Sequence, residues 1–144
     1  MDYRFACLVV ALSGLCSAAP QETVVTGTTS SCVDGKTVHT SDVEIFVFPR
    51  SEKLASLIDS VLKATDANVF DRFDKLIKYV KGTKALARTT SDATGSFRVK
   101  IPLLDNVTVF GYMETEDNPF YWMHSEVDVA HRSAVSVVLS YCKR

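Results

Sequence analysis

Thr89-Thr90-Ser91-Asp92-Ala93-Thr94-Gly95-Ser96-Phe97 is a polar turn set between two apolar runs, and the rest of the chain is organised around it. Asp92 can accept hydrogen bonds from backbone N–H groups just downstream, and Gly95 can take the positive φ that closes a turn. Phe97 then begins an alternating run in which its side chain points inward. The stretch predicts a β-hairpin whose turn residues are Asp92, Gly95 and Phe97.

Part of this stretch, Ser91-Asp92-Ala93-Thr94-Gly95-Ser96-Phe97, resembles the Thr-Asp-x-x-Gly-x-Phe motif of the carboxypeptidase regulatory-like domains. The other landmarks of that family follow in the same order in this chain. They are Val25-Thr26-Gly27, then Asp34-Gly35-Lys36-Thr37-Val38 leading to residues 42–47, then Val135-Ser136-Val137. The resemblance implies a mainly β, seven-stranded Greek-key β-sandwich of prealbumin (transthyretin-like) topology, with its first and last strands parallel in one sheet.

The first eighteen residues have the pattern of a signal peptide. Arg4 precedes an apolar run over residues 5–15 that is too short to span a bilayer, and small residues follow it up to Ala18. We therefore expect cleavage after Ala18 and a mature domain of residues 19–144 with no membrane span, secreted or periplasmic. A buried N-terminal helix or a retained anchor is the alternative interpretation.

Cys32 and Cys142 are the two cysteines of this mature domain. In an exported protein such a pair usually forms a disulfide, although two separate buried thiols are the alternative. The parallel first and last strands that the resemblance implies would bring both cysteines to the same end of the fold. We predict that they are bridged.

Residues 43–48 alternate as a strand does, with Phe46 and Phe48 on the face opposite Val43, Ile45 and Val47. Two large aromatic side chains on the supposed outer face of a sandwich need a cover. The sequence that follows this strand is expected to provide one.

Residues 51–82 contain two apolar stripes with helical period, which predict a helical pair inserted between the second and third strands. We expect a break at residues 65–68, with Thr65 or Asp66 capping the second helix and Gly82 ending it. The pair either shields Phe46 and Phe48 or forms a lid or partner-binding surface.

Tyr112, Tyr121 and Trp122 are the best candidates for a recognition surface, because aromatic side chains carry a large apolar area with few rotors to freeze. The alternative is that Trp122 fills the sandwich while Tyr121 lies against the helices. The formal charge of −1 gives no electrostatic reason to expect nucleic acid as a partner. We therefore expect a protein or glycan partner of unknown identity.

Catalytic and metal-binding patterns find little support. Glu114, Glu116 and Asp117 could offer oxygen ligands to calcium, or act with His124 in a small hydrolase, but they lack the spacing of a calcium loop. His39, His124 and His131 are scattered without zinc spacing, and no Ser lies in a Gly-x-Ser-x-Gly setting. We expect no enzyme activity, no metal and no cofactor.

Asn106-Val107-Thr108 is an N-glycosylation sequon, which matters only in a eukaryotic secretory pathway. Taken together, the sequence predicts a non-catalytic exported domain with a binding or scaffolding role. The alternative is a transthyretin-like carrier of a small hydrophobic ligand, with a cavity lined by Phe46, Phe73 or Trp122.

Overall fold

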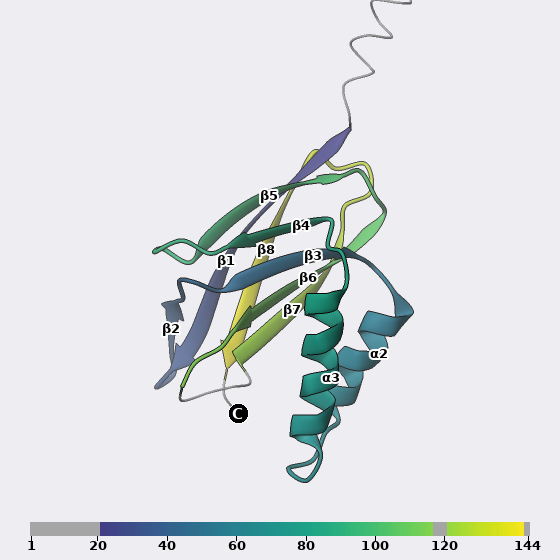
Figure 1. The fold of residues 1–144 in the computed structure, drawn as a ribbon. Coiled ribbons are helices and arrows are strands. Elements are labelled where there is room, and N and C mark those ends of the chain that lie inside the picture. The colour runs from purple at the N-terminus through teal and green to yellow at the C-terminus, as the bar shows by residue number, and fades with distance from the viewer. Residues whose placement is uncertain (1–20, 117–120, 143–144) are drawn as a thin grey trace, which may run out of the picture.

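The computed structural model describes residues 21–116 and 121–142, so the expected signal peptide at residues 1–18 lies outside the described residues. Eight strands and two helices make up this part of the chain (Figure 1). In chain order they are β1 (Glu22–Val33), β2 (Lys36–His39), β3 (Glu44–Pro49), α2 (Glu52–Leu62), α3 (Val69–Gly82), β4 (Ala87–Thr90), β5 (Ser96–Pro102), β6 (Asn106–Met113), β7 (Tyr121–Asp128) and β8 (Ala134–Cys142).

The strands form two four-stranded sheets that face each other. In sheet A, β1 pairs with β2 and β5 along one side and with β8 along the other, and sheet B has the order β4-β3-β6-β7. This confirms the predicted β-sandwich, with one strand more than expected. The extra strand is β2, whose four residues are all exposed and carry no alternating pattern that would predict a strand.

Strand β3 is buried on both faces, because it separates two apolar clusters. Val43, Ile45 and Val47 face the space between the sheets, and Phe46 and Phe48 face the helices. The alternation predicted for residues 43–48 is therefore confirmed.

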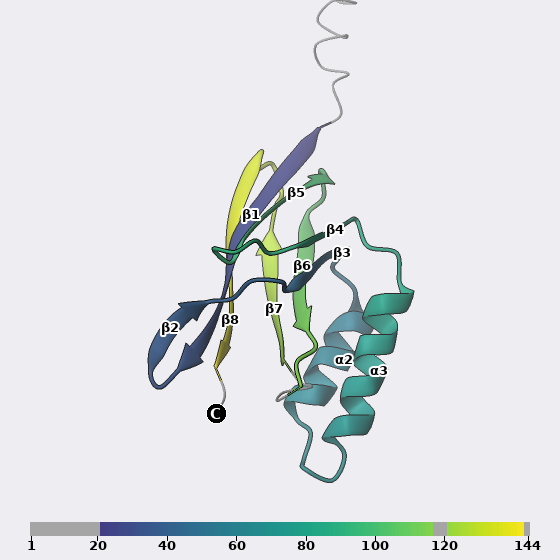
Figure 2. The same ribbon diagram turned by 60° about the vertical axis from the view of Figure 1, so that its left-hand side comes forward.

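Both helices lie on the outer face of sheet B, on the side away from sheet A (Figure 2). Ser51 caps the start of helix α2, because its side chain accepts a hydrogen bond from the Leu54 N–H. The buried stripe of each helix then packs onto the aromatic side chains of β3 and β6. The cluster contains Phe46, Phe48, Leu54, Ile58, Val61, Phe73, Leu76, Val80, Phe110 and Tyr112. The helical pair thus shields Phe46 and Phe48, the first of the two roles expected for it.

The break between the helices falls at the predicted place, and Gly82 is the last residue of α3. The predicted cap was wrong, however. Asn68 rather than Thr65 or Asp66 occupies the cap position, and its side chain makes no cap bond to α3. The Asn68 amide oxygen instead accepts from the Thr65 N–H at 2.9 Å, which closes the connecting turn.

The turn at residues 91–97 has the predicted chemistry. The Asp92 carboxylate accepts from the Thr94 and Ser96 N–H groups at 2.9 and 3.0 Å. It also accepts from the Thr94 hydroxyl, and these bonds, the hydroxyl first, lower the pKa of Asp92. Gly95 has a φ of +76°, and Phe97 is buried. The turn residues therefore behave as the sequence predicts.

The expectation of a hairpin was wrong, because the strands on either side of this turn are not paired with each other. Strand β4 pairs with β3 in sheet B, whereas β5 pairs with β1 in sheet A. The turn therefore carries the chain from one sheet to the other.

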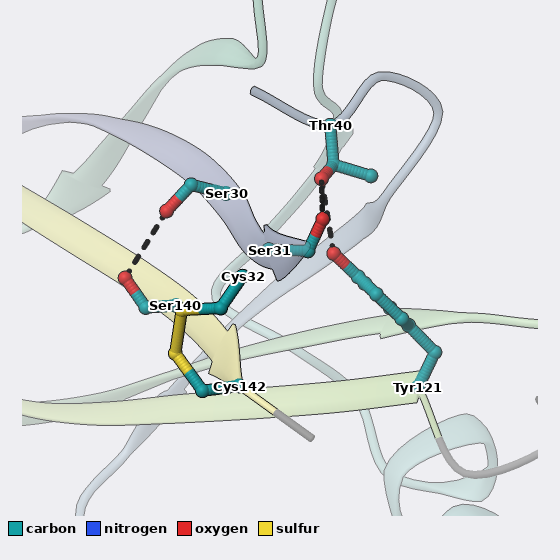
Figure 3. Close-up of a disulfide and its surroundings, with 7 residues drawn as sticks. All are labelled: Ser30, Ser31, Cys32, Thr40, Tyr121, Ser140 and Cys142. Carbon is teal, nitrogen blue, oxygen red and sulfur yellow. Dashed lines mark hydrogen bonds between the residues drawn. A yellow bond between two sulfur atoms is a disulfide. The ribbon is translucent and has the colours of Figure 1, made fainter. Parts of the chain in front are cut away.

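Strands β1 and β8 are parallel neighbours, as the family resemblance implies, and their register places Cys32 opposite Cys142. The two cysteines form a disulfide, with their Cα atoms 4.7 Å apart. Figure 3 shows the bridge beside a hydrogen bond of 3.1 Å between the hydroxyls of Ser30 and Ser140. The predicted disulfide is confirmed.

Candidate binding surface

The three aromatic residues predicted to form a recognition surface are divided between the two faces of sheet B. Tyr121 points into the sandwich, where its ring lies 4.6 Å from that of Tyr141. Its hydroxyl donates to the Thr40 Oγ1 at 3.0 Å (Figure 3). Tyr121 is therefore a core residue. The alternative interpretation placed Trp122 in the sandwich and Tyr121 against the helices. The two side chains do face opposite sides, but Tyr121 fills the sandwich and Trp122 faces outward.

Tyr112 and Trp122 are cross-strand partners on the outer face of sheet B. Tyr112 is covered by α3, because its ring lies 6.1 Å from that of Phe73 and the Lys81 ammonium sits 5.0 Å from its centroid. Burial, helped by the negative charge of Glu114, raises the pKa of Tyr112, so its hydroxyl keeps its proton. Tyr112 lies under helix α3 and is only 6% exposed.

Trp122 lies where the helical cover ends. Its ring is stacked on Phe110 at 5.7 Å and on His124 at 5.6 Å, and both Trp122 and His124 are half-buried. Phe110 itself is fully buried. The three rings therefore form a column that runs from the core under the helices to the outer face of β7.

Glu126 continues the same face of β7 and is exposed. Its Oε1 accepts a hydrogen bond of 2.7 Å from the hydroxyl of the buried Thr108, which fixes the carboxylate against β6. We call the row formed by Trp122, His124 and Glu126 the β7 surface. It presents a half-buried indole, an imidazole and a carboxylate held by the Thr108 hydroxyl.

Burial lowers the pKa of His124, and the nearby carboxylate of Glu126 opposes that shift only in part. The imidazole is therefore neutral near pH 7. A neutral imidazole offers one donor and one acceptor, whereas an imidazolium offers only donors. The β7 surface can thus both donate hydrogen bonds to a ligand and accept them.

The acidic loop does not build a metal site within the described residues. Glu114 and Glu116 are the last acidic residues before the gap, and Asp117 lies outside the described part of the chain. Across residues 21–116 and 121–142, no group of three His, Cys, Asp or Glu side chains is placed to hold a metal ion. In the same residues, no helix is long and apolar enough to cross a membrane.

Two open clefts are lined by none of the residues of the β7 surface, and the sequence pattern did not predict them. The larger, about 440 Å³, lies where β3 joins α2, against the loop that leads into β6. It is lined by Pro49, Arg50, Ser51, Glu52, Ala55, Leu104, Asp105 and Asn106. The second, about 320 Å³, lies beside the start of β1 and the β7–β8 connection. Both are lined by segments that are distant in sequence, which no local pattern reveals.

No protein-family model matches the chain, and no curated protein matches it in sequence. A proposed carbohydrate-binding protein from Pseudomonas aeruginosa has a similar structure, with a TM-score of 0.56 and 14% identity over 89% of this chain and 95% of that one. This similarity supports the β-sandwich fold and extends to the fold alone.

Pilin structures are more distant. The minor pilin of Streptococcus agalactiae has a TM-score of 0.49 and 8% identity, over 86% of this chain and 45% of that one. The major pilin subunit of Bacillus cereus has a TM-score of 0.47 and 12% identity, over 87% of this chain and 31% of that one. The chain thus spans less than half the length of either pilin structure.

Proposed function

We propose that this chain is an exported, non-catalytic binding domain that holds a glycan on its β7 surface. The proposal includes removal of residues 1–18 as a signal peptide and a single domain over residues 19–144 of the carboxypeptidase regulatory-like kind. The disulfide supports the exported location, because such bonds persist in oxidising compartments. The parallel β1–β8 pair supports the resemblance.

One observation carries the choice of ligand and site. Trp122, His124 and Glu126 lie in one row on the outer face of β7, where Trp122 packs against the helix-covered cluster and Glu126 is exposed. A sugar ring has an apolar face that packs against aromatic side chains, and hydroxyls that bond to carboxylates and imidazoles. The carbohydrate-binding role proposed for the structurally similar Pseudomonas aeruginosa protein agrees with this choice.

The carrier alternative has weaker support. Phe46 and Phe73, two of the side chains expected to line its cavity, are 2% and 7% exposed and packed within the helix-covered cluster. Neither of the two clefts described above is lined by them or by Trp122.

Trp122 is the only tryptophan of the sequence, so intrinsic fluorescence reports directly on the proposed site. We would titrate the purified chain with a panel of oligosaccharides and follow the tryptophan emission. A bound sugar is expected to give a saturable change in emission. Calorimetry of the same pair should show affinity weakened by on the order of tenfold or more in Trp122→Ala.

A matched pair of histidine variants controls this experiment. His124→Ala changes the β7 surface, whereas His39→Ala makes the same change at an exposed position of β2 on the other sheet. We expect the first to weaken binding and the second to leave it unchanged. Equal effects of both variants, or no response to any glycan, would overturn the proposal. If a protein ligand binds instead, and its binding depends on Trp122, the partner at the β7 surface is a protein rather than a glycan.

We also propose that Asn106 carries an N-linked glycan when the chain passes through a eukaryotic secretory pathway. Asn106 is exposed at the first position of β6, where a bulky modification has access to solvent. The test is the mass of the chain secreted from eukaryotic cells, before and after enzymatic removal of N-glycans. An unchanged mass, identical to that of Asn106→Gln apart from the substitution itself, would contradict the assignment.

A further inference from the structure

Strand β8 forms an open edge of sheet A. Among the described strands it pairs only with β1, over the register from Val24–Ala134 to Cys32–Cys142. Figure 2 shows it, in yellow, bordering sheet A on the side opposite β5. The edge is nine residues long, which is more than an average strand.

This edge lacks the protection that the other edges have. Strand β8 contains no charged residue and no proline, since its sequence is Ala-Val-Ser-Val-Val-Leu-Ser-Tyr-Cys. In contrast, edge strand β5 carries Arg98 and Lys100, and edge strand β7 carries Glu126 and Asp128. Charges on edge strands oppose pairing with another chain, so their absence over nine residues marks β8 as the edge that is fit for pairing.

The backbone groups at this edge can be assigned from the β1–β8 ladder. The Val24 N–H donates to the Ser133 carbonyl at 2.9 Å, and the Thr26 hydroxyl donates to the Val135 carbonyl. In a parallel pair of strands, every second residue directs both its N–H and its C=O toward the neighbouring strand, and the residues between them direct both groups away from it. Odd-numbered residues of β8 therefore face β1, and the N–H and C=O groups of Ala134, Ser136, Val138, Ser140 and Cys142 point away from it.

Val138 lies at the centre of this set. It is 67% exposed, the highest value among the exposed large apolar side chains of the described residues. An antiparallel strand related by a two-fold axis at Val138 would face Val138 with its own Val138, and Ser136 with Ser140. Each of these residues directs its backbone groups outward, as a hydrogen-bonded antiparallel pair requires. The edge is therefore complementary to itself.

We propose that β8 pairs in antiparallel fashion with β8 of a second copy of this chain, about a two-fold axis at Val138. The pairing joins two A sheets into one continuous sheet and forms about ten new backbone hydrogen bonds. The small Ala and Ser side chains around Val138 place no bulk or charge between the copies. A two-fold contact of this kind closes on itself, so the assembly ends at a dimer.

The test is sedimentation velocity of the oxidised chain over the micromolar to sub-millimolar range. We expect a concentration-dependent dimer. Val138→Lys should raise the dissociation constant of the dimer several-fold, because it sets two like charges directly opposite each other. The control Leu62→Lys makes the same kind of change at the 63% exposed end of α2 and should leave the dimer intact.

A mixture of Val138→Lys and Val138→Glu completes the test. Each variant alone should dimerise more weakly than the unmodified chain, and the mixture should dimerise more strongly than either variant because opposite charges then face each other. Retention of the disulfide and of the circular dichroism spectrum shows that each variant is folded. A monomer at every concentration, a dimer unaffected by Val138→Lys, or growth beyond the dimer would each overturn the proposal.

Discussion

The ring of Phe97 occupies the space that any side chain at Gly27 would need. The two residues are cross-strand partners on β5 and β1. A Cβ atom at position 27 would lie 2.4 Å from Phe97 Cζ and 2.5 Å from the Val137 carbonyl oxygen. Gly27 is therefore required for close packing of the aromatic ring over β1.

Gly27→Ala should destabilise the fold by about 1–3 kcal/mol, because the ring and the β8 backbone must both move. The control is Gly82→Ala at the end of α3, where an added Cβ has no atom within 4 Å. That change should be neutral or stabilising, since alanine restricts the unfolded chain. Urea unfolding of both variants gives the comparison, and a Gly27→Ala variant as stable as the unmodified chain would refute the packing argument.

The disulfide joins residues 110 positions apart and should stabilise the fold mainly by restricting the unfolded chain. In the chain-entropy model, removing it costs about 4 to 5 kcal/mol. We therefore expect a reducing agent to lower the urea midpoint of the oxidised chain substantially. The double variant Cys32→Ser, Cys142→Ser should show the low midpoint with or without reductant. An unchanged midpoint on reduction would contradict this prediction.

The helical pair should be an integral part of the folded unit rather than an appendage. Leu76 is fully buried between α3 and sheet B, whereas Leu62 is 63% exposed at the end of α2. Leu76→Ala should cost about 2–5 kcal/mol, the usual penalty for a cavity in a core. Leu62→Ala should change stability by less than about 0.5 kcal/mol. If the two variants unfold at the same urea concentration, the helices do not pack as described.

His124 should make stability depend on pH in a defined direction. Burial lowers its pKa in the folded state, so below about pH 6.5 the unfolded chain binds a proton that the folded chain does not. Stability is at its full value above that pH, and falls as the pH drops, until His124 protonates in the folded state. His124→Gln should flatten this slope, while His39→Gln, at an exposed position of β2, should preserve it. Urea unfolding between pH 7.5 and 5.5 measures the slopes directly.

The sequence predicted those features in which a local pattern has one structural outcome. The alternation of residues 43–48 could only place Phe46 and Phe48 together on one face, and helical stripes were the only pattern available to cover them. The disulfide followed from the two cysteines of the expected mature domain together with the family resemblance. In each case the local chemistry and the long-range packing agree.

The errors arose where local chemistry is compatible with two outcomes. Asp92 and Gly95 fix the shape of a turn, but whether its strands pair with each other depends on β1 and β3, which are distant in sequence. Alternation similarly required Tyr121 and Trp122 to face opposite sides without saying which faced inward. The pairing of β7 with β6 determines which side chain faces inward. Met123, opposite Gly111, belongs to the core between the sheets, and Tyr121 lies on the same face of β7 as Met123. The exposed strand β2 and both clefts left no periodic signal at all.

The bridge between Cys32 and Cys142 also determines how the domain would respond to a pulling force. The start of β1 and the end of β8 lie at opposite ends of the sandwich (Figure 1). A load applied at these two points passes along β1 to Cys32, crosses the sulfur–sulfur bond and leaves at Cys142. The segment between the two cysteines, which are 110 residues apart, therefore cannot be pulled out while the disulfide is intact. Under oxidising conditions the domain acts as a short tether that yields little contour length even after its sheets have come apart.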